Sequence, residues 1–67
     1  MCVTNSREFG AALRKQRTVA DMSLPELAIK AQLPKSLLST LENGKGNPSL
    51  ATLHKLAKAL NVEITIQ

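Results

Sequence analysis

Residues 23 to 49 read Ser-Leu-Pro-Glu-Leu-Ala-Ile-Lys-Ala-Gln-Leu-Pro-Lys-Ser-Leu-Leu-Ser-Thr-Leu-Glu-Asn-Gly-Lys-Gly-Asn-Pro-Ser. This stretch predicts two short helices, over residues 24–31 and 34–43, with a tight turn at Gln32-Leu33 between them. A Gly-rich loop that contains one Pro follows the second helix. Polar residues lie on one side of the second helix, so that side is available to a partner.

Both helices carry recognisable end signals. Ser23 and Glu26 have the spacing of a capping box, and Pro25 lies in the first turn, where a missing N–H costs little. Asn43-Gly44, at the end of the second helix, tolerates a left-handed backbone. The arrangement is that of a helix-turn-helix, in which one helix braces and the next enters the DNA major groove.

The flanking segments extend this unit. Apolar residues at helical spacing predict further helices over 6–18 and 49–60, capped by Asn5 or Ser6 and by Ser49. Residues 62–66 alternate apolar and polar side chains, with β-branched residues prominent, and predict a strand. We expect an all-α bundle of about four helices in a single domain over 1–67. The expected core consists of Phe9, Ala12, Leu13, Leu27, Ala28, Ala31, Leu38, Leu41, Leu50, Leu53, Leu56, Ala57 and Leu60.

The predicted C-terminal strand has no predicted partner strand elsewhere in the chain. Pairing with the same strand of a second copy would remove an exposed edge and add apolar burial, which a 67-residue core needs. The strand therefore predicts a homodimer formed through Val62, Ile64 and Ile66. The alternative is a frayed tail, with dimerisation through the helix at 49–60.

The chain is basic, with nine Lys and Arg against five Asp and Glu and a net charge of +4. Six of the nine cations lie between residues 14 and 46, around the two central helices. Such a surface attracts polyanions, although the same charges could merely solubilise helix faces. One Phe and no Trp or Tyr leave little for stacking single-stranded bases, so duplex DNA is the expected partner.

Several other classes are disfavoured. Cys2 is the single cysteine, near an N-terminus expected to fray, so an intramolecular disulfide is impossible and a reducing cytoplasm is indicated. No apolar run has the length of a membrane span. His54, the only histidine, has only Cys2 as a soft companion, which is too little for a zinc site. Paired carboxylates for acid–base chemistry are missing, so we expect no enzyme, no metal and no cofactor.

From Arg17 to Leu60, about two thirds of its length, the chain resembles the Cro/repressor (Xre-like) helix-turn-helix family of phage and bacterial regulators. The resemblance implies a small lambda-repressor-like bundle that binds DNA. The matching residues are Leu27-Ala28, Lys30, Ser36, Ser39, Leu41-Glu42, Gly44-Lys45, Asn47-Pro48-Ser49, Leu50, Leu53 and the run from Leu56 to Leu60.

The resemblance also implies roles for individual residues. Base edges would be read by Lys35, Ser36, Ser39 and Thr40. Phosphates would be held by backbone N–H groups around Ser23, Leu24 and Asn43, and by the side chains of Arg14, Lys30 and Lys45. Arg17 would pair with Glu42 and tie the recognition helix to the scaffold; the alternative is that Arg17 reaches a phosphate.

The chain departs from the family pattern at Leu24, Gln32, Pro34, Leu37 and Gly46. Leu24 and Leu37 could contact thymine methyl groups or form an apolar patch that binds a protein. The expected function is a homodimeric repressor that reads an inverted-repeat operator in duplex DNA. The alternatives are an antitoxin that represses its own operon and binds a toxin, or a protein-interaction module that has lost DNA binding.

Overall fold

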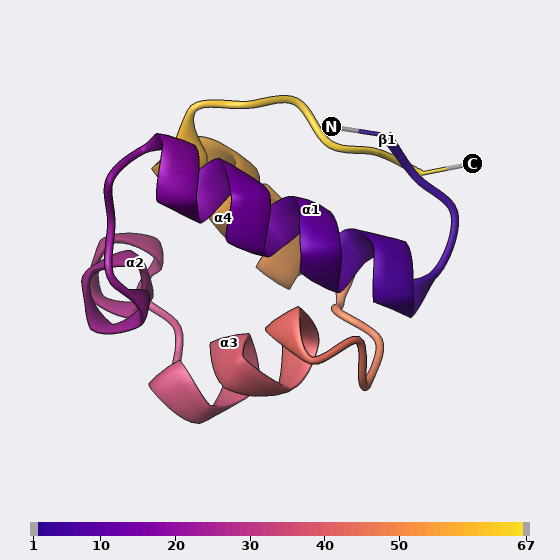
Figure 1. The fold of residues 1–67 in the computed structure, drawn as a ribbon, viewed down its shortest axis with the longest axis horizontal. Helices are drawn as coiled ribbons and strands as arrows, with labels where there is room; N and C mark the ends of the chain where they lie inside the picture. Colours follow the sequence, from indigo (N-terminus) through magenta and orange to yellow (C-terminus); the bar gives the residue numbers. More distant parts are fainter. Residues whose placement is uncertain (1, 67) are drawn as a thin grey trace.

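Four helices make up most of the computed structural model, which describes residues 2–66 (Figure 1). The elements are β1 (Cys2–Val3), α1 (Ser6–Val19), α2 (Leu24–Ala31), α3 (Lys35–Glu42), α4 (Leu50–Leu60) and β2 (Thr65–Ile66). The predicted all-α fold is therefore confirmed, and each observed helix end lies within one residue of its predicted position.

The helix ends follow the signals in the sequence. Asn5 accepts a hydrogen bond from the Glu8 N–H at the start of α1, and Ser23 and Glu26 form both bonds of the capping box at α2. The backbone N–H of Ser23 is the main reason that the pKa of Glu26 is lowered. Gln32, which replaces the turn glycine usual in the family, adopts the left-handed conformation itself, with φ of 58°.

One hydrophobic core holds the helices together. Its fully buried large side chains are Leu13, Leu27, Leu38, Leu41 and Leu56, which come from all four helices. Phe9, Ala28 and Ala31 are also buried, and Ala12 packs against them, as the helical spacing predicted. Each helix thus contributes one apolar stripe, which is the usual way a small helical domain buries enough surface to fold.

Leu50 contradicts the predicted core. It was expected on the apolar stripe of α4, but its side chain is 83% exposed. The buried residues of α4 are Thr52, Leu53, Leu56, Ala59 and Leu60. Leu50 lies about a third of a turn away from the centre of that face at 3.6 residues per turn. Ala57 lies at the edge of the face and is only half-buried.

The C-terminal strand also differs from its prediction. It is limited to Thr65–Ile66 and pairs in parallel with β1, with Cys2 opposite Thr65 and Val3 opposite Ile66. The expectations that this strand has no partner in its own chain, and that the N-terminus is frayed, are therefore wrong. The buried side chain of Val3 anchors β1 on the core. Val62 and Ile64 pack against the same core, as their alternation predicted, and the side chain of Ile66 lies outside what the structure describes.

Helices α1 and α3 approach each other closely at Gly10. A Cβ at this position would overlap the carbonyl oxygen of Leu41 and would come within 3.0 Å of the carbonyl oxygen of Glu42 and the nitrogen of Gly44. Gly10 is buried in the middle of the first half of α1. Its missing side chain therefore sets how closely the C-terminal end of α3 can approach the scaffold.

Candidate nucleic-acid interface

Helix α3 lies along one side of the molecule (Figure 1). Most of its exposed side chains are polar. Leu38 and Leu41 bury its inner face. Of the predicted base-reading residues, Lys35, Ser36 and Thr40 are exposed and Ser39 is half-buried. The Thr40 hydroxyl donates to the Ser36 carbonyl oxygen at 3.0 Å, so it is left to act as an acceptor toward a base.

The loop after α3 lies against the end of the same surface. Lys45 is exposed, its N–H donates to the Thr40 carbonyl oxygen, and a Cβ on Gly46 would lie 3.7 Å from the Thr40 methyl group. Ser6 of α1 secures the loop by donating to the carbonyl oxygen of Gly46 at 2.8 Å and to the Asn47 side chain at 3.1 Å. Lys45 therefore extends the polar surface of α3 with a cation on a braced loop.

Most of the backbone N–H groups predicted to hold phosphate are already used within the chain. Those of Asn43, Gly44 and Lys45 donate to carbonyl oxygens of α3, where they close the end of the helix. The N–H of Ser23 donates to the Glu26 carboxylate at 3.0 Å. The N–H groups of Ser23 and Asn43 are therefore already occupied within the chain, and the exposed side chains of these residues remain available.

Leu24 differs from Ser23 and Asn43 in the state of its backbone N–H. Its N–H lies in the first turn of α2 and has no hydrogen-bond partner among the residues that the structure describes. Its side chain, like that of Leu37, is half-buried and packs against the core. The apolar surface that these two leucines offer to any partner is thus reduced.

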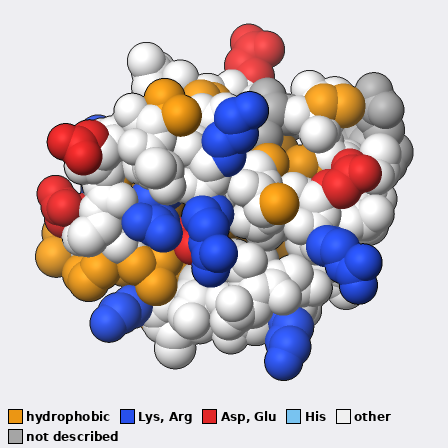
Figure 2. All heavy atoms as spheres, viewed as in Figure 1, with side chains coloured by type: hydrophobic (Ala, Val, Ile, Leu, Met, Phe, Trp, Pro, Cys, Tyr) orange, Lys and Arg blue, Asp and Glu red, His pale blue; other side chains and the backbone are white. Residues whose placement is uncertain are grey.

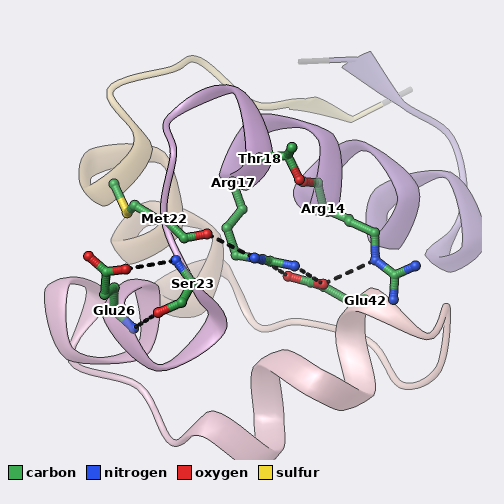
Figure 3. Close-up of polar contacts among 7 residues, drawn as sticks. All are labelled: Arg14, Arg17, Thr18, Met22, Ser23, Glu26 and Glu42. Carbon is green, nitrogen blue, oxygen red and sulfur yellow. Dashed lines mark hydrogen bonds and ion pairs between the residues drawn. The ribbon is translucent and has the colours of Figure 1, made fainter.

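The predicted pair of Arg17 and Glu42 is confirmed, and it is part of a larger network (Figure 3). Arg17 donates to both carboxylate oxygens of Glu42, from Nε at 2.7 Å and from Nη2 at 3.2 Å. Its Nη1 donates to the Met22 carbonyl oxygen at 2.8 Å. One guanidinium therefore joins α1, the connection between α1 and α2, and the end of α3.

Arg14 is a second partner of Glu42 that the sequence did not indicate. Its Nε lies 3.3 Å from Glu42 Oε1, while its side chain is 62% exposed. The Glu42 side chain is only 4% exposed and the Arg17 side chain 18%. The hydrogen bond to Glu42 is the main reason that the pKa of Arg17 is raised. Because two arginines compensate the carboxylate, Glu42 does not repel a polyanion at α3.

Lys30 lies apart from the other predicted phosphate-binding cations. It lines a hollow between α2 and α4 with His54, Lys55 and Lys58. Lys35 instead lines a hollow on the other side of α2 with Ile29. Of the predicted DNA-binding cations, Lys35 and Lys45 therefore belong to α3 and the loop after it, and Arg14 contacts Glu42 at the end of α3. Figure 2 shows the cations of the viewed face spread over α1 and α3, and apolar side chains gathered over α2.

The described residues offer no competing kind of site. No group of three metal-ligating side chains occurs among residues 2–66, and no helix in that range has the length and apolarity needed to cross a membrane. The arrangement consists of a rigidly held helix with exposed hydroxyl and ammonium groups and a neutralised carboxylate behind it. The hydroxyl and ammonium groups of this surface are of the kinds that form hydrogen bonds with base edges in a major groove.

Comparisons with known proteins agree with this geometry. A family model described as a helix-turn-helix domain matches residues 8–65. The immunity repressor protein of Bacillus phage phi105 is 39% identical over 54 residues, which cover 81% of this chain and 35% of the repressor. The chain thus spans about a third of that relative.

Two solved structures are similar over most of their length. The restriction-modification controller protein C.AhdI from Aeromonas hydrophila has 38% identity and a TM-score of 0.83, over 87% of this chain and 88% of its own. The second structure is that of SinR, the master biofilm regulator of Bacillus subtilis, in complex with DNA. It has 39% identity and a TM-score of 0.78, over 82% of this chain and 89% of its own. SinR has also been solved in complex with the SinI protein.

Proposed function

Because the chain belongs to the Cro/repressor-type (Xre-like) helix-turn-helix family, we propose that it is a transcriptional repressor that reads duplex DNA through α3. Members of this family are regulators and not enzymes. The observation that carries the proposal is the exposed polar face of α3, held in place by the bidentate contact between Arg17 and Glu42. Lys35 and Ser36 lie at the start of α3, the part of a recognition helix that contacts base edges.

Lys35 and Lys45 should differ in what they contribute to DNA binding. Lys35→Ala is expected to weaken operator binding more than random-DNA binding, because a base contact discriminates by about 1–3 kcal/mol. Lys45→Ala is expected to weaken both nearly equally and to lower the salt dependence by about one unit of slope, as a phosphate contact does. Fluorescence anisotropy titrations at several salt concentrations measure both quantities.

Lys30→Ala is the matched control for these two variants, because Lys30 is exposed but faces α4 rather than α3. Lys30→Ala should leave the ratio of operator affinity to random-DNA affinity unchanged. It should alter the salt dependence of binding only as much as the loss of one remote charge does. If Lys35→Ala weakens binding uniformly across sequences, then Lys35 does not read bases, and the reading must come from Ser36, Ser39 or Thr40.

The repressor is proposed to act as a homodimer formed through β2. Within the described residues the sheet has two strands, so β2 pairs with β1 on one edge only. Antiparallel pairing of the other edge with its two-fold mate would give a four-stranded sheet and remove an edge that is prone to aggregation. Two recognition helices would then reach adjacent major grooves, and the operator would be an inverted repeat with half-sites about 34 Å apart.

Deleting residues 65–67 should therefore raise the dimer dissociation constant by about tenfold or more, equal to about 1.4 kcal/mol. Sedimentation equilibrium measures the constant, and circular dichroism checks that the helices remain folded. A truncated protein that stays dimeric at micromolar concentration would exclude β2 as the dimer contact.

A second candidate function is an antitoxin or another regulator with a protein partner. The observation that favours a protein partner is that the similar SinR occurs in a complex with SinI. A pure interaction module should bind bulk duplex DNA negligibly at low salt, whereas a repressor or an antitoxin should bind it with a strong salt dependence. A toxin gene adjacent to the coding gene would favour the antitoxin.

A further inference from the structure

Helices α2 and α4 form a hollow whose cations have no role in the proposed reading of DNA. Its walls carry Lys30 in the last turn of α2 and Lys55 and Lys58 on α4, with His54 beside them. The volume of the hollow, about 400 Å³, lies within the range of sites for small ligands. The loop that carries Lys45 lies on the opposite side of Figure 1 from α2. Three of the chain's nine lysines and arginines therefore meet away from that loop.

No carboxylate lines this hollow among the residues that the structure describes. Helix α4, which supplies two of the lysines, contains no Asp or Glu. The ion pairs found among the described residues both belong to Glu42 on α3. Glu26 lies four residues before Lys30, but its carboxylate accepts the N–H of Ser23 at 3.0 Å. Glu63 lies in the neighbouring hollow and does not line this one.

Helix-end electrostatics explain only part of the cluster. A cation in the last turn of a helix interacts favourably with the helix dipole, which accounts for Lys30 and Lys58. Lys55 lies in the middle of α4, three residues before Lys58, and like charges at this spacing destabilise a helix slightly. An anion bound in the hollow replaces this repulsion with attraction to every cation around it.

The side chains in the hollow favour phosphate over a carboxylate or a protein surface. Arginine is preferred for bidentate contact with carboxylates, whereas lysine binds phosphate as a point charge, and no arginine lines the hollow. Its buried lining residues are the small Ala31 and Ala59, so the large anchors of a protein interface are missing. His54, Lys55 and Lys58 lie within about 6 Å along the axis of α4. This spacing suits a compact anion with several charges.

We propose that this cationic hollow, defined by Lys30, His54, Lys55 and Lys58, binds a small ligand that carries at least two linked phosphate groups. Lys30 holds the phosphates from α2 and the other two lysines hold them from α4, so the ligand bridges the two helices. His54 and Gln32, which also line the hollow, have N–H groups that donate hydrogen bonds to phosphate oxygens. The ligand leaves the outward face of α3 free, so this inference goes beyond the proposed function and does not depend on it.

Isothermal titration calorimetry with inorganic tripolyphosphate tests the site, at an ionic strength of about 0.15 M, which screens diffuse attraction. Two variants with the same net charge are compared, and all of their substitutions are at exposed positions. The hollow variant carries Lys30→Gln, Lys55→Gln and Lys58→Gln. The control variant carries Lys15→Gln, Lys35→Gln and Lys45→Gln. Circular dichroism checks that both variants remain folded.

The wild type should bind one tripolyphosphate. The hollow variant should bind it about tenfold or more weakly, and the control variant should stay within about threefold of the wild type. Inorganic phosphate and a short polyglutamate peptide should each bind the wild type about tenfold or more weakly than tripolyphosphate does. The salt dependence of duplex DNA binding should be nearly the same for the hollow variant and the wild type, because the hollow is not a DNA contact.

Each contrary result would overturn the proposal in a different way. A wild type that does not bind tripolyphosphate has no such site, and equal losses in the two variants would indicate attraction to overall positive charge only. Inorganic phosphate that binds as tightly as tripolyphosphate would show that linked phosphates are not selected. Equally tight binding of polyglutamate would make an acidic polypeptide the ligand. A salt slope for duplex DNA that falls by about three units in the hollow variant would assign the three lysines to the DNA backbone.

Discussion

Replacing Gly10 with Ala is expected to destabilise the domain severely, although Ala is the better helix former. Helix propensity alone would favour Ala by about 1 kcal/mol. The new methyl group would instead overlap the Leu41 carbonyl oxygen and crowd the backbone of Glu42 and Gly44. These are backbone atoms of a packed helix end, which cannot rotate away as a flexible side chain can. Overpacking of this kind costs about 1–3 kcal/mol or more, a large share of the stability of a small domain.

Urea denaturation followed by circular dichroism measures this effect for Gly10→Ala. The matched control is Ala11→Gly at the neighbouring exposed position of α1, where propensity alone should cost about 1 kcal/mol. The sign of the change in the free energy of unfolding distinguishes the two effects. Helix propensity alone predicts that Gly10→Ala stabilises the protein, whereas the steric overlap predicts that it destabilises the protein. A variant as stable as the wild type would show that α1 and α3 do not approach as closely as described.

The second large effect is expected from Glu42→Ala. Its carboxylate is buried and accepts hydrogen bonds from Arg17 and Arg14, and its removal leaves the partly buried Arg17 guanidinium without an anion. Breaking one partner of a buried pair costs about 3–5 kcal/mol, whereas an exposed pair is worth less than about 1 kcal/mol. Since Arg17 is partly exposed and keeps its bond to the Met22 carbonyl oxygen, we expect a loss of about 2–3 kcal/mol.

Arg14→Ala distinguishes the contribution of Arg14 to stability from that of Arg17. Arg14 is mostly exposed and makes a single contact with Glu42, so its removal should cost less than about 1 kcal/mol. Its effect should appear in DNA affinity instead, if Arg14 also reaches a phosphate. Equal melting temperatures for Glu42→Ala and wild type would mean that the pair does not support the fold.

The helices and the pairing of Arg17 with Glu42 could be predicted from the sequence because local signals or the family pattern specify them. The capping box at Ser23 and Glu26 is a local pattern, and it recurs in the structure as expected. Leu50 shows where reasoning from helical spacing fails. An apolar residue near the end of a helix can lie on the buried face of that helix or beside it. Only the packing of α4 against α2 decides which side is buried.

The missed features depend on contacts between distant segments. The pairing of β1 with β2 joins residues at opposite ends of the chain, and a two-residue strand has no pattern of its own. The need for Gly10 likewise arises only where the backbone of α3 lies against α1, far along the chain. The backbone N–H of Asn43 is predicted to hold phosphate because the hydrogen bond that it makes at the end of α3 is not visible in a sequence.

The parallel pairing of Cys2 with Thr65 has a consequence for how this domain can be connected to others. Its first and last strands lie side by side, so a polypeptide enters β1 and leaves β2 on the same side of the domain, at opposite ends of this short parallel pair (Figure 1). Domains with adjacent ends tolerate insertion into a loop of a host protein and circular permutation. The braced loop at Gly46 and Asn47 offers a surface position at which new ends could be opened. The same domain is thus suited to insertion into other proteins, because its neighbouring ends require little separation of the insertion point.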